Sequence, residues 1–269
     1  MAKLKALLLT EGYHGMISQV EGLAKALNTE FHHEIVRLNW PWNYIPPRFT
    51  PKSEIILKDK KCISVSENCD LVISCGRKSV IPSTLLKKKN KNIFTIHIQN
   101  PKVKFNNFDL IVAPDHDGIN GDNIITSKGS IHYLTLEEIN KSRFYLEKNT
   151  EKNKDIITLI LGGPNKYYNY LEENIKNILY KINEYIDKYN LQLIVIPSNR
   201  TPKKIINMIK NIRSNYLIVD KVDKQAYLSS LSLSKYIVVT CDSTSMISEA
   251  ALTGKPIYVA MIPATKNDY

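Results

Sequence analysis

Cysteine, arginine and long apolar runs are all scarce in this chain of 269 residues, and each scarcity argues against a class of protein. The four cysteines form no CxxC pair and no metal-ligand spacing, which favours a reduced cytoplasmic setting over a disulfide framework or zinc module. No apolar run approaches the ~20 residues that span a bilayer. The short apolar run near the N-terminus breaks at Glu11 without a small-residue cleavage pattern, so it predicts a first strand rather than a signal peptide.

Lysine, in contrast, is abundant and makes the chain strongly basic. The formal net charge is +11 and the pI is about 9.3, which suits a polyanionic partner such as nucleic acid, anionic lipid or a phosphorylated substrate. Only six of the 37 basic residues are arginine, and no nucleic-acid motif or aromatic-interleaved arginine patch occurs. The lysine runs are typical of solvated faces. We therefore expect no nucleic-acid partner and leave an anionic membrane surface open.

Short β-rich runs alternate with helical stretches along the whole chain, which predicts parallel sheets built from βαβ units. The strands expected in the first half are 4–10, 33–38, 70–76, 92–101 and 108–118. Those expected in the second half are 155–163, 191–197, 215–220, 235–240 and 256–262. Between about 134 and 154 the composition becomes charged and asparagine-rich, as in an interdomain helix and linker. The pattern predicts an α/β protein of two Rossmann-like domains facing a cleft, residues 1–150 and 151–269.

The stretch TCDSTSMISEAALTGKPIYV, residues 240–259, concentrates hydroxyls and acids between a predicted strand and a predicted helix. A helix that begins near Ser243 or Ser245 offers unpaired backbone N–H groups and a positive dipole end to an anion. The alternative is a capped helix with no ligand, with Ser245 as the N-cap. A capping box needs an acid three residues later, and Glu249 lies four residues later. Residue types alone leave both interpretations open.

Two more polar loops follow strands of the same predicted sheet. Gly162 and Gly163 lack β-carbons, which lets a backbone approach a phosphate closely. Ser198 and Arg200 follow the next strand, and an arginine can clamp a diphosphate with two hydrogen bonds. Each loop alone could be an ordinary turn. Because ligands of open parallel sheets bind beyond the carboxyl ends of the strands, these loops together with Asp242 favour a nucleotide-diphosphate site.

The N-terminal half places its own polar residues at strand ends. Gly12, His14 and Gly15 lie in a strand-to-helix turn, and the reference pKa of histidine near 6.5 would suit a catalytic base. A lone histidine in a loop can also be merely polar. Gly76 and Arg77 lie at a predicted helix start, where an anion contact and a simple capped helix are both open.

Two further strand ends carry amides and acids. Gln99 and Asn100 are amides suited to hydroxyl-rich ligands. The loop PDHDG, residues 114–118, contains Asp117 and invites a metal, but adjacent residues alternate direction and no second ligand cluster completes a shell. We therefore interpret this loop as a polar cleft loop or tight turn and expect no metal.

Six segments occur together in a specific order. They are DLVISCGRKSV (70–80), FTIHIQNP (94–101), FDLIVAPDHDGI (108–119), LILGGPNKYY (159–168), PSNRTP (197–202) and VVTCDSTSMISEAALTGKPIYV (238–259). In this order they resemble bacterial relatives of the plant mitochondrial-fission "elongated mitochondria" family, which is similar to a branch of the GT-B glycosyltransferases. The resemblance runs through nearly the whole chain. It implies a nucleotide sugar bound mainly by the C-terminal domain, an acceptor bound mainly by the N-terminal domain, and no metal or other cofactor.

The resemblance also implies roles for individual positions. Glu249 would take the ribose hydroxyls, while Ser243 and Ser245 would hold the diphosphate. The glycine-rich turn with His14 would face the donor, although lipid-acceptor members place the histidine after the second glycine and here it precedes Gly15. The remaining donor-site positions would be Gly162 and Gly163 in the lining and Ser198 and Arg200 on the rim. The chain stops at Tyr269, so we expect the C-terminal domain to lack the closing helices of its relatives.

Residues and resemblance together predict a metal-independent transferase in envelope or lipid-linked glycan synthesis. It would use a nucleotide-diphosphate sugar, and we expect the nucleotide to be uridine-based. Helix-end N–H groups and Arg200 or Arg77 would stabilise the departing diphosphate. His14 or Asp117 would deprotonate the acceptor hydroxyl. The alternatives are a nucleotide-sugar epimerase on the same fold and a non-catalytic adaptor that recruits a partner at a membrane. The expected location is cytoplasmic, with a peripheral position on the inner membrane face left open.

Overall fold

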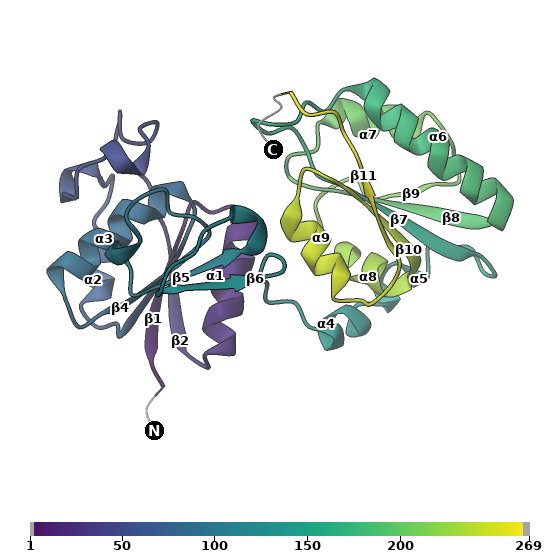
Figure 1. The fold of residues 1–269 in the computed structure, drawn as a ribbon. Coiled ribbons are helices and arrows are strands. Elements are labelled where there is room, and N and C mark those ends of the chain that lie inside the picture. Colours follow the sequence, from purple (N-terminus) through teal and green to yellow (C-terminus); the bar gives the residue numbers. More distant parts are fainter. Residues whose placement is uncertain (1–2, 266–269) are drawn as a thin grey trace. The chain divides into compact units, whose positions relative to one another are not determined.

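The computed structural model describes residues 3–265 and divides the chain into two compact units, residues 1–133 and 134–269 (Figure 1). Each unit contains one all-parallel sheet with helices packed on it, which confirms the predicted α/β fold class. The division falls before the charged segment that we predicted as the end of the first domain, so this segment belongs to unit 2. The predicted end of the second domain, residues 266–269, lies outside the described residues.

Unit 1 is built on a six-stranded sheet of order β2-β1-β3-β4-β5-β6. Its strands are β1 (Lys5–Thr10), β2 (Glu30–Ile35), β3 (Leu71–Cys75), β4 (Phe94–Ile98), β5 (Leu110–Pro114) and β6 (Ile124–Ser127). Its helices are α1 (His14–Ala26), α2 (Lys61–Ser66) and α3 (Val80–Lys89), with short 3-10 turns η1 (Pro47–Phe49), η2 (Glu54–Ile56), η3 (Arg77–Ser79), η4 (Phe105–Asn107) and η5 (Asp115–Asp117).

The central strand β1 shows why these apolar runs form a buried parallel sheet. Successive side chains of a strand point to opposite faces. Leu7 and Leu9 pack into one hydrophobic cluster, while Ala6 and Leu8 pack into another. A strand buried on both faces needs an uninterrupted apolar sequence, as in ALLL at residues 6–9.

Unit 2 is built on a five-stranded sheet of order β11-β10-β7-β8-β9. Its strands are β7 (Asp155–Leu161), β8 (Leu191–Pro197), β9 (Leu217–Ile218), β10 (Ser234–Thr240) and β11 (Ile257–Ala260). Its helices are α4 (Leu136–Lys141), α5 (Phe144–Glu147), α6 (Glu172–Tyr189), α7 (Lys203–Lys210), α8 (Lys224–Leu233) and α9 (Thr244–Ala251).

The long helix α6 covers the unit 2 sheet with a single apolar stripe. Its buried residues recur at spacings of three and four, and they are Ile175, Leu179, Ile182 and Ile186. All four belong to the hydrophobic cluster that includes Leu159 and Leu193 of the sheet. Among residues 3–265, no helix is both long enough and apolar enough to cross a membrane.

The predicted interdomain segment forms α4 and α5, which pack on α8 of unit 2. The Ser229 hydroxyl in α8 accepts from the Leu146 N–H at 3.0 Å and donates to the Arg143 carbonyl at 2.7 Å. The Ser142 hydroxyl donates to Gln225 of α8 at 3.0 Å. These hydrogen bonds explain why this charged segment, which we predicted to be a linker, is part of the second unit.

Candidate functional site

The carboxylate of Asp242 lies at the centre of the C-terminal edge of the unit 2 sheet, and its side chain is fully buried. One oxygen, Oδ2, accepts from the Gly163 N–H and from the Arg200 guanidinium, both at 2.9 Å. The other, Oδ1, accepts from the Thr240 hydroxyl at 2.7 Å and from the Tyr170 hydroxyl at 3.0 Å. One carboxylate therefore joins the loops that follow β7, β8 and β10.

Gly162 and Gly163 are required by close packing against this network. A β-carbon on Gly162 would lie 2.0 Å from Oδ2 of Asp242, and one on Gly163 would lie 2.2 Å from the Arg200 carbonyl oxygen. The Gly162 N–H donates to the Thr240 hydroxyl at 2.9 Å. The glycine pair was predicted for close approach of a phosphate. In the structure it already permits close approach of protein groups.

The loop after β8 is fastened to the loop after β7 through two hydroxyls. Ser198 donates to the Gly162 carbonyl at 2.8 Å, and Thr201 donates to the Leu161 carbonyl at 3.1 Å. The Ser198 N–H in turn donates to the Thr201 hydroxyl at 2.8 Å. The hydroxyl of Ser198 is therefore engaged within the loops. Thr201 was not singled out from the sequence, although SNRT after a strand is a signal that could have found it.

Arg200 and Asp242 were predicted to contact a ligand, but in the structure their side chains contact each other. The Arg200 guanidinium donates to Asp242 and also to the Gly163 carbonyl at 2.9 Å, while 37% of its side chain stays exposed. The buried carboxylate of Asp242 positions the loops and presents no oxygen to solvent. Tyr170 was missed by sequence reasoning. Burial, and then the nearby charge of Asp242, raise the pKa of Tyr170 well above its usual value, so its hydroxyl stays a donor.

Helix α9 begins beside this cluster without a side-chain cap from its N-cap residue. Its N-cap is Ser243, with extended backbone (φ −133°, ψ 93°), and the Ser243 side chain makes no capping hydrogen bond within the described chain. Ser245 is the second helical residue rather than the N-cap. Four N–H groups of a helix start lack intrahelical partners. The alternative of a helix capped by Ser245 is therefore not what the structure shows.

Glu249 lies farther along α9 and is half-buried. Its Oε2 accepts from the Tyr227 hydroxyl of α8 at 2.9 Å. Tyr227 was not predicted, because nothing in the helical sequence KQAYLSSLSL shows which neighbour its tyrosine meets. This contact fixes the direction of the carboxylate that the resemblance assigns to the ribose.

The corresponding edge of unit 1 contains smaller, separate contacts. Glu11, after β1, accepts from the Lys78 N–H at 3.1 Å, and its carboxylate lies 3.4 Å from the Lys78 ammonium. Gly76 has φ +94°, a conformation that favours glycine. The Arg77 guanidinium donates to the Ile45 carbonyl at 2.9 Å and to the Asn43 carbonyl. Arg77, expected to contact an anion, thus holds a loop of its own unit.

The turn that carries His14 leaves this side chain exposed. His14 is the first residue of α1. Gly12 has φ +87°, and its N–H donates to the Thr10 hydroxyl at 3.1 Å. The Gly15 carbonyl accepts from the Gln19 side chain at 3.0 Å. Gly12 shapes the turn, and Tyr13 and His14 are both exposed to solvent there.

The amide and acid loops of unit 1 also meet each other. The Asn100 N–H donates to the Asp117 carboxylate at 2.9 Å, which joins the loops after β4 and β5. Gln99 has φ +81°, unusual for a residue with a side chain, and its amide lies 3.5 Å from Gln19. No group of three potential metal-ligating acids, histidines or cysteines occurs in the part of the chain that the structure describes.

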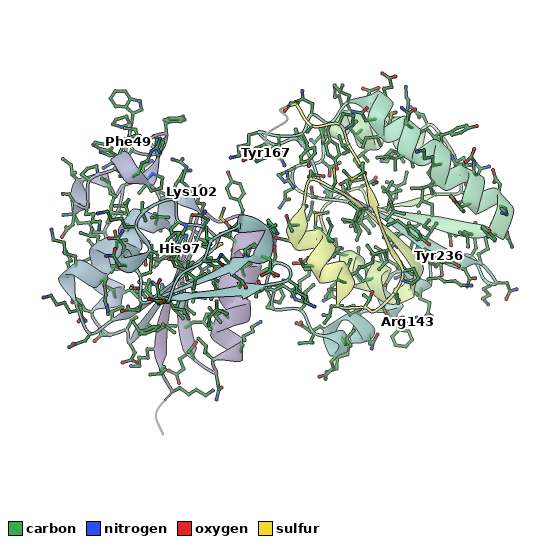
Figure 2. The ribbon with its side chains drawn as sticks, in the orientation of Figure 1. Phe49, His97, Lys102, Arg143, Tyr167 and Tyr236 are labelled. Carbon is green, nitrogen blue, oxygen red and sulfur yellow. The ribbon has the colours of Figure 1, made fainter. Side chains whose placement is uncertain are left out.

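His97, in β4, is buried within the sheet layer (Figure 2). Its Nδ1 lies 2.9 Å from the Ser74 hydroxyl, and its ring lies 5.0 Å from that of Phe108. Burial lowers its pKa to about 3, so the imidazole is neutral at physiological pH. It takes no part in the candidate site.

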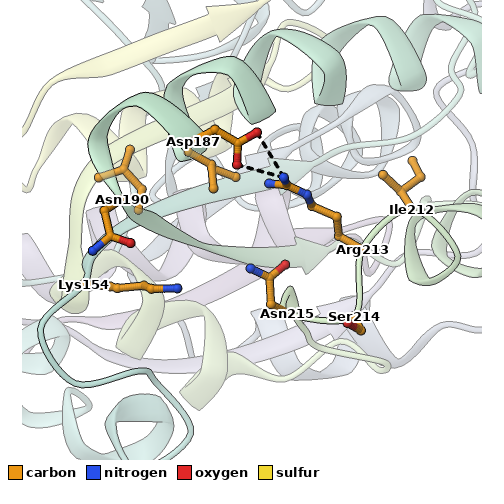
Figure 3. Close-up of a pocket in the computed structure, with 9 residues that line it drawn as sticks. Lys154, Asp187, Asn190, Ile212, Arg213, Ser214 and Asn215 are labelled. Atoms are coloured by element: carbon orange, nitrogen blue, oxygen red, sulfur yellow. Dashed lines mark hydrogen bonds and ion pairs between the residues drawn. The ribbon is translucent and has the colours of Figure 1, made fainter.

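A pocket of about 530 Å³ lies at the other end of the unit 2 sheet, near the start of β8 (Figure 3). Its Arg213 makes two hydrogen bonds to Asp187, at 2.8 and 3.0 Å. Lys154 also lines it and lies 2.6 Å from Glu151. Both cations of this pocket are therefore paired with acids.

Comparison with known proteins shows related sequences. The family model described as Mitochondrial fission ELM1 matches residues 14–268. A mitochondrial fission protein ELM1 of Arabidopsis thaliana is 23% identical, over 95% of this chain and 78% of that protein. An uncharacterised protein of Rickettsia prowazekii is 27% identical over 72% of this chain and 65% of its own, so this chain spans less than two thirds of that protein's length.

Several solved structures have a similar fold. A UDP-GlcNAc 2-epimerase from Methanocaldococcus jannaschii is similar with a TM-score of 0.60, at 19% identity over 94% of this chain and 82% of that one. A glycosyltransferase from Rickettsia africae is similar with a TM-score of 0.54, at 15% identity over 97% of this chain and 81% of that one. At these identities the likeness establishes the fold.

Proposed function

The chain belongs to the mitochondrial fission ELM1 family, and from this premise we propose that it binds a uridine-based nucleotide sugar on unit 2 and transfers the sugar to an acceptor. The activity would be that of a metal-independent GT-B glycosyltransferase in envelope or lipid-linked glycan synthesis. One observation carries the proposal: three strand-end loops converge on Asp242 beside the start of α9, which its N-cap side chain leaves uncapped.

The diphosphate would bind at the start of α9. The first-turn N–H groups and the positive end of the helix dipole attract an anion, and the hydroxyls of Ser243 and Ser245 are at this position. The Asp242 network holds the adjacent loops in place. Donors that are already in position stabilise a developing charge without reorganisation. Gly163 and the exposed part of Arg200 would form the rim.

The ribose would bind at Glu249. A carboxylate accepts hydrogen bonds from two vicinal hydroxyls, and the Tyr227 hydroxyl holds Glu249 in one direction. A nucleoside recognised in this way places its diphosphate toward the helix start, since both groups lie on α9. The fold shared with UDP-GlcNAc 2-epimerase supports uridine as the base.

The acceptor would be activated on unit 1. His14 is exposed, whereas one oxygen of Asp117 already accepts the Asn100 N–H, so we assign the base to His14 and a positioning role to Asp117. The acceptor hydroxyl would give its proton to His14 while its oxygen bonds to the anomeric carbon. The bond from that carbon to the diphosphate oxygen would break, and the electron pair would leave with the UDP beside α9.

Calorimetric titration with UDP tests the binding site. We expect saturable binding by the wild type and at least about a tenfold loss in Ser245→Asp, because the new carboxylate repels the diphosphate, and in Glu249→Ala, which removes the ribose acceptor. The matched control is Lys204→Asp, which puts the same acid at the same position of α7. Its UDP affinity should change far less.

Other outcomes would contradict the proposed site or favour a different function. Unchanged affinity in both site variants would place the nucleotide elsewhere. No heat with any nucleotide would support a non-catalytic adaptor. Conversion of UDP-GlcNAc to its 2-epimer with no acceptor present, followed by proton NMR of the anomeric signal, would support an epimerase on the same fold.

A further inference from the structure

The loop between β2 and α2 of unit 1 exposes unusually large apolar side chains. We call residues 39–58 the aromatic loop. Four of its side chains are between 65% and 81% exposed: Trp40, Tyr44, Phe49 and Ile55. Figure 2 places Phe49 at an outer end of unit 1, beyond the sheet. Single exposed apolar residues are ordinary, but several on one segment indicate a binding surface.

The aromatic loop is ordered by contacts to the body of unit 1. The Asn39 side chain donates to the Ile55 and Leu57 carbonyls at 2.9 and 3.0 Å. Ile56 is fully buried, and Trp42 packs against the same hydrophobic cluster. Arg77 donates to the Ile45 carbonyl at 2.9 Å. The loop therefore presents its exposed side chains from a fixed frame, which lowers the entropic cost of binding.

The same loop carries positive charge beside its aromatic rings. Arg48, Lys52 and Lys58 are exposed, and the Arg48 guanidinium lies 4.6 Å from the centre of the Phe49 ring. The acid Glu54 is paired with Lys60 at 2.9 Å and with Lys89. Hydrogen bonds from these two lysines lower the pKa of Glu54 to about 2.

We propose that the aromatic loop binds the surface of an anionic lipid bilayer. Tryptophan and tyrosine rings are amphipathic and lie at the level of the lipid headgroups. Lysine and arginine beside them attract anionic headgroups. A second copy of the chain fits this surface poorly, because it would bring Arg48, Lys52 and Lys58 against their like-charged counterparts. The inference goes beyond the proposed sugar transfer and does not depend on it.

Tryptophan emission offers a direct test, because the two tryptophans of the chain, Trp40 and Trp42, both lie in the aromatic loop. The full chain is mixed with vesicles of phosphatidylcholine and phosphatidylglycerol, or of phosphatidylcholine alone. We expect a blue shift and co-sedimentation with the anionic vesicles, much less with the neutral ones, and a decrease in both signals as salt is added.

Variants locate the binding surface. The triple variant Trp40→Ser, Tyr44→Ser, Phe49→Ser should bind anionic vesicles about tenfold more weakly or worse. Arg48→Gln and Lys58→Gln should each weaken binding about fivefold. The matched control is Tyr180→Ser, Tyr185→Ser, Tyr189→Ser, which removes three exposed tyrosines of α6 and should bind like the wild type. Circular dichroism checks that every variant is folded, as expected for exposed positions.

Several results would overturn the proposal. Equal vesicle binding by the aromatic triple variant and the wild type is one. Co-sedimentation without any change in tryptophan emission is another, because binding would then use a different surface. No vesicle binding by the wild type, with self-association that the triple variant loses in size-exclusion chromatography, would assign the loop to a second copy. UDP titration of the triple variant should match the wild type, which separates this proposal from the sugar-binding one.

Discussion

The two sheet edges of this protein differ in how their loops are held. In unit 2 a single buried carboxylate, Asp242, joins the loops after β7, β8 and β10. In unit 1 the loops are joined in separate pairs, Glu11 with Lys78 and Asp117 with Asn100. The unit 2 edge thus has one common anchor, whereas these unit 1 loops are joined by separate contacts.

Replacing the acid that joins the loops at each edge should give the largest difference in stability between the two edges. Asp242→Ala removes the buried acceptor shared by the Gly163 N–H, one Arg200 nitrogen and two hydroxyls, so we expect a loss of about 3–5 kcal/mol in the free energy of unfolding. Glu11→Ala, the matched change in unit 1, should cost about 1–2 kcal/mol. Urea unfolding followed by circular dichroism measures both. Equal losses would mean that the two edges are held alike.

A single added methyl group should give the second-largest difference in stability between the two edges. Gly162→Ala places a β-carbon against the buried Asp242 carboxylate and should destabilise unit 2 by about 2–3 kcal/mol. Gly118→Ala in unit 1 meets nothing within 4 Å but has φ +62°, so left-handed backbone strain alone should cost about 1 kcal/mol. Thermal unfolding of the two variants gives the ranking. A Gly162 variant as stable as the Gly118 variant would contradict the close packing.

Acid should affect unit 1 through His97. Its pKa is near 6.5 unfolded and about 3 when folded, so below pH 6.5 the unfolded state binds the additional proton. This contribution to stability is complete above pH 6.5 and falls as the pH decreases, by about 2 kcal/mol at pH 5. In His97→Asn that pH dependence should disappear.

Tryptophan emission can measure the unfolding of unit 1, because both tryptophans belong to this unit. Urea midpoints are compared between pH 7.5 and pH 5 for the wild type and His97→Asn, since carboxylates titrate in both. The same pH dependence in the two proteins would show that His97 is not the group responsible.

The smallest effect concerns the arginine at each edge. Arg200→Lys keeps the charge but loses the fork that reaches both Asp242 and the Gly163 carbonyl, and should cost about 1 kcal/mol because the side chain is partly exposed. Arg77→Lys, which loses two backbone contacts, should cost about 0.5 kcal/mol. Chemical unfolding resolves the order. A larger cost at Arg77 would reverse the comparison.

Much of the architecture could be predicted from local pattern. The apolar runs at 4–10 and 191–197 correspond to β1 and β8, and the amphipathic stretch 170–189 corresponds to α6. These elements can be predicted because the spacing of their apolar residues along the chain matches the period of a strand or a helix. The strand predicted at 33–38 begins earlier, at Glu30 in β2. This edge strand is largely exposed, so its apolar signal is weak. The short strand β6 was not predicted for the same reason.

The candidate site was only partly predictable. Sequence placed Gly162, Ser198 and Asp242 at strand ends, and parallel topology brings such ends to one edge. It could not distinguish a residue that touches a ligand from one that holds the loops, because the two roles use the same residue types. Tyr170 and Tyr227 were missed, since each reaches its partner from a neighbouring segment with no local signal.

Alternation of apolar strands and amphipathic helices was sufficient to specify an α/β protein with two parallel sheets, because side-chain burial repeats with the period of each element. Three-dimensional contacts were needed for everything that depends on distance between remote residues. Through such contacts the Asp242 side chain is buried and paired with Arg200, and residues 134–150 belong to the second unit. The contacts also held Trp40 outward while Ile56 turned inward. The physical reason is that hydrogen bonding and packing act between atoms that folding brings together, whatever their separation along the chain.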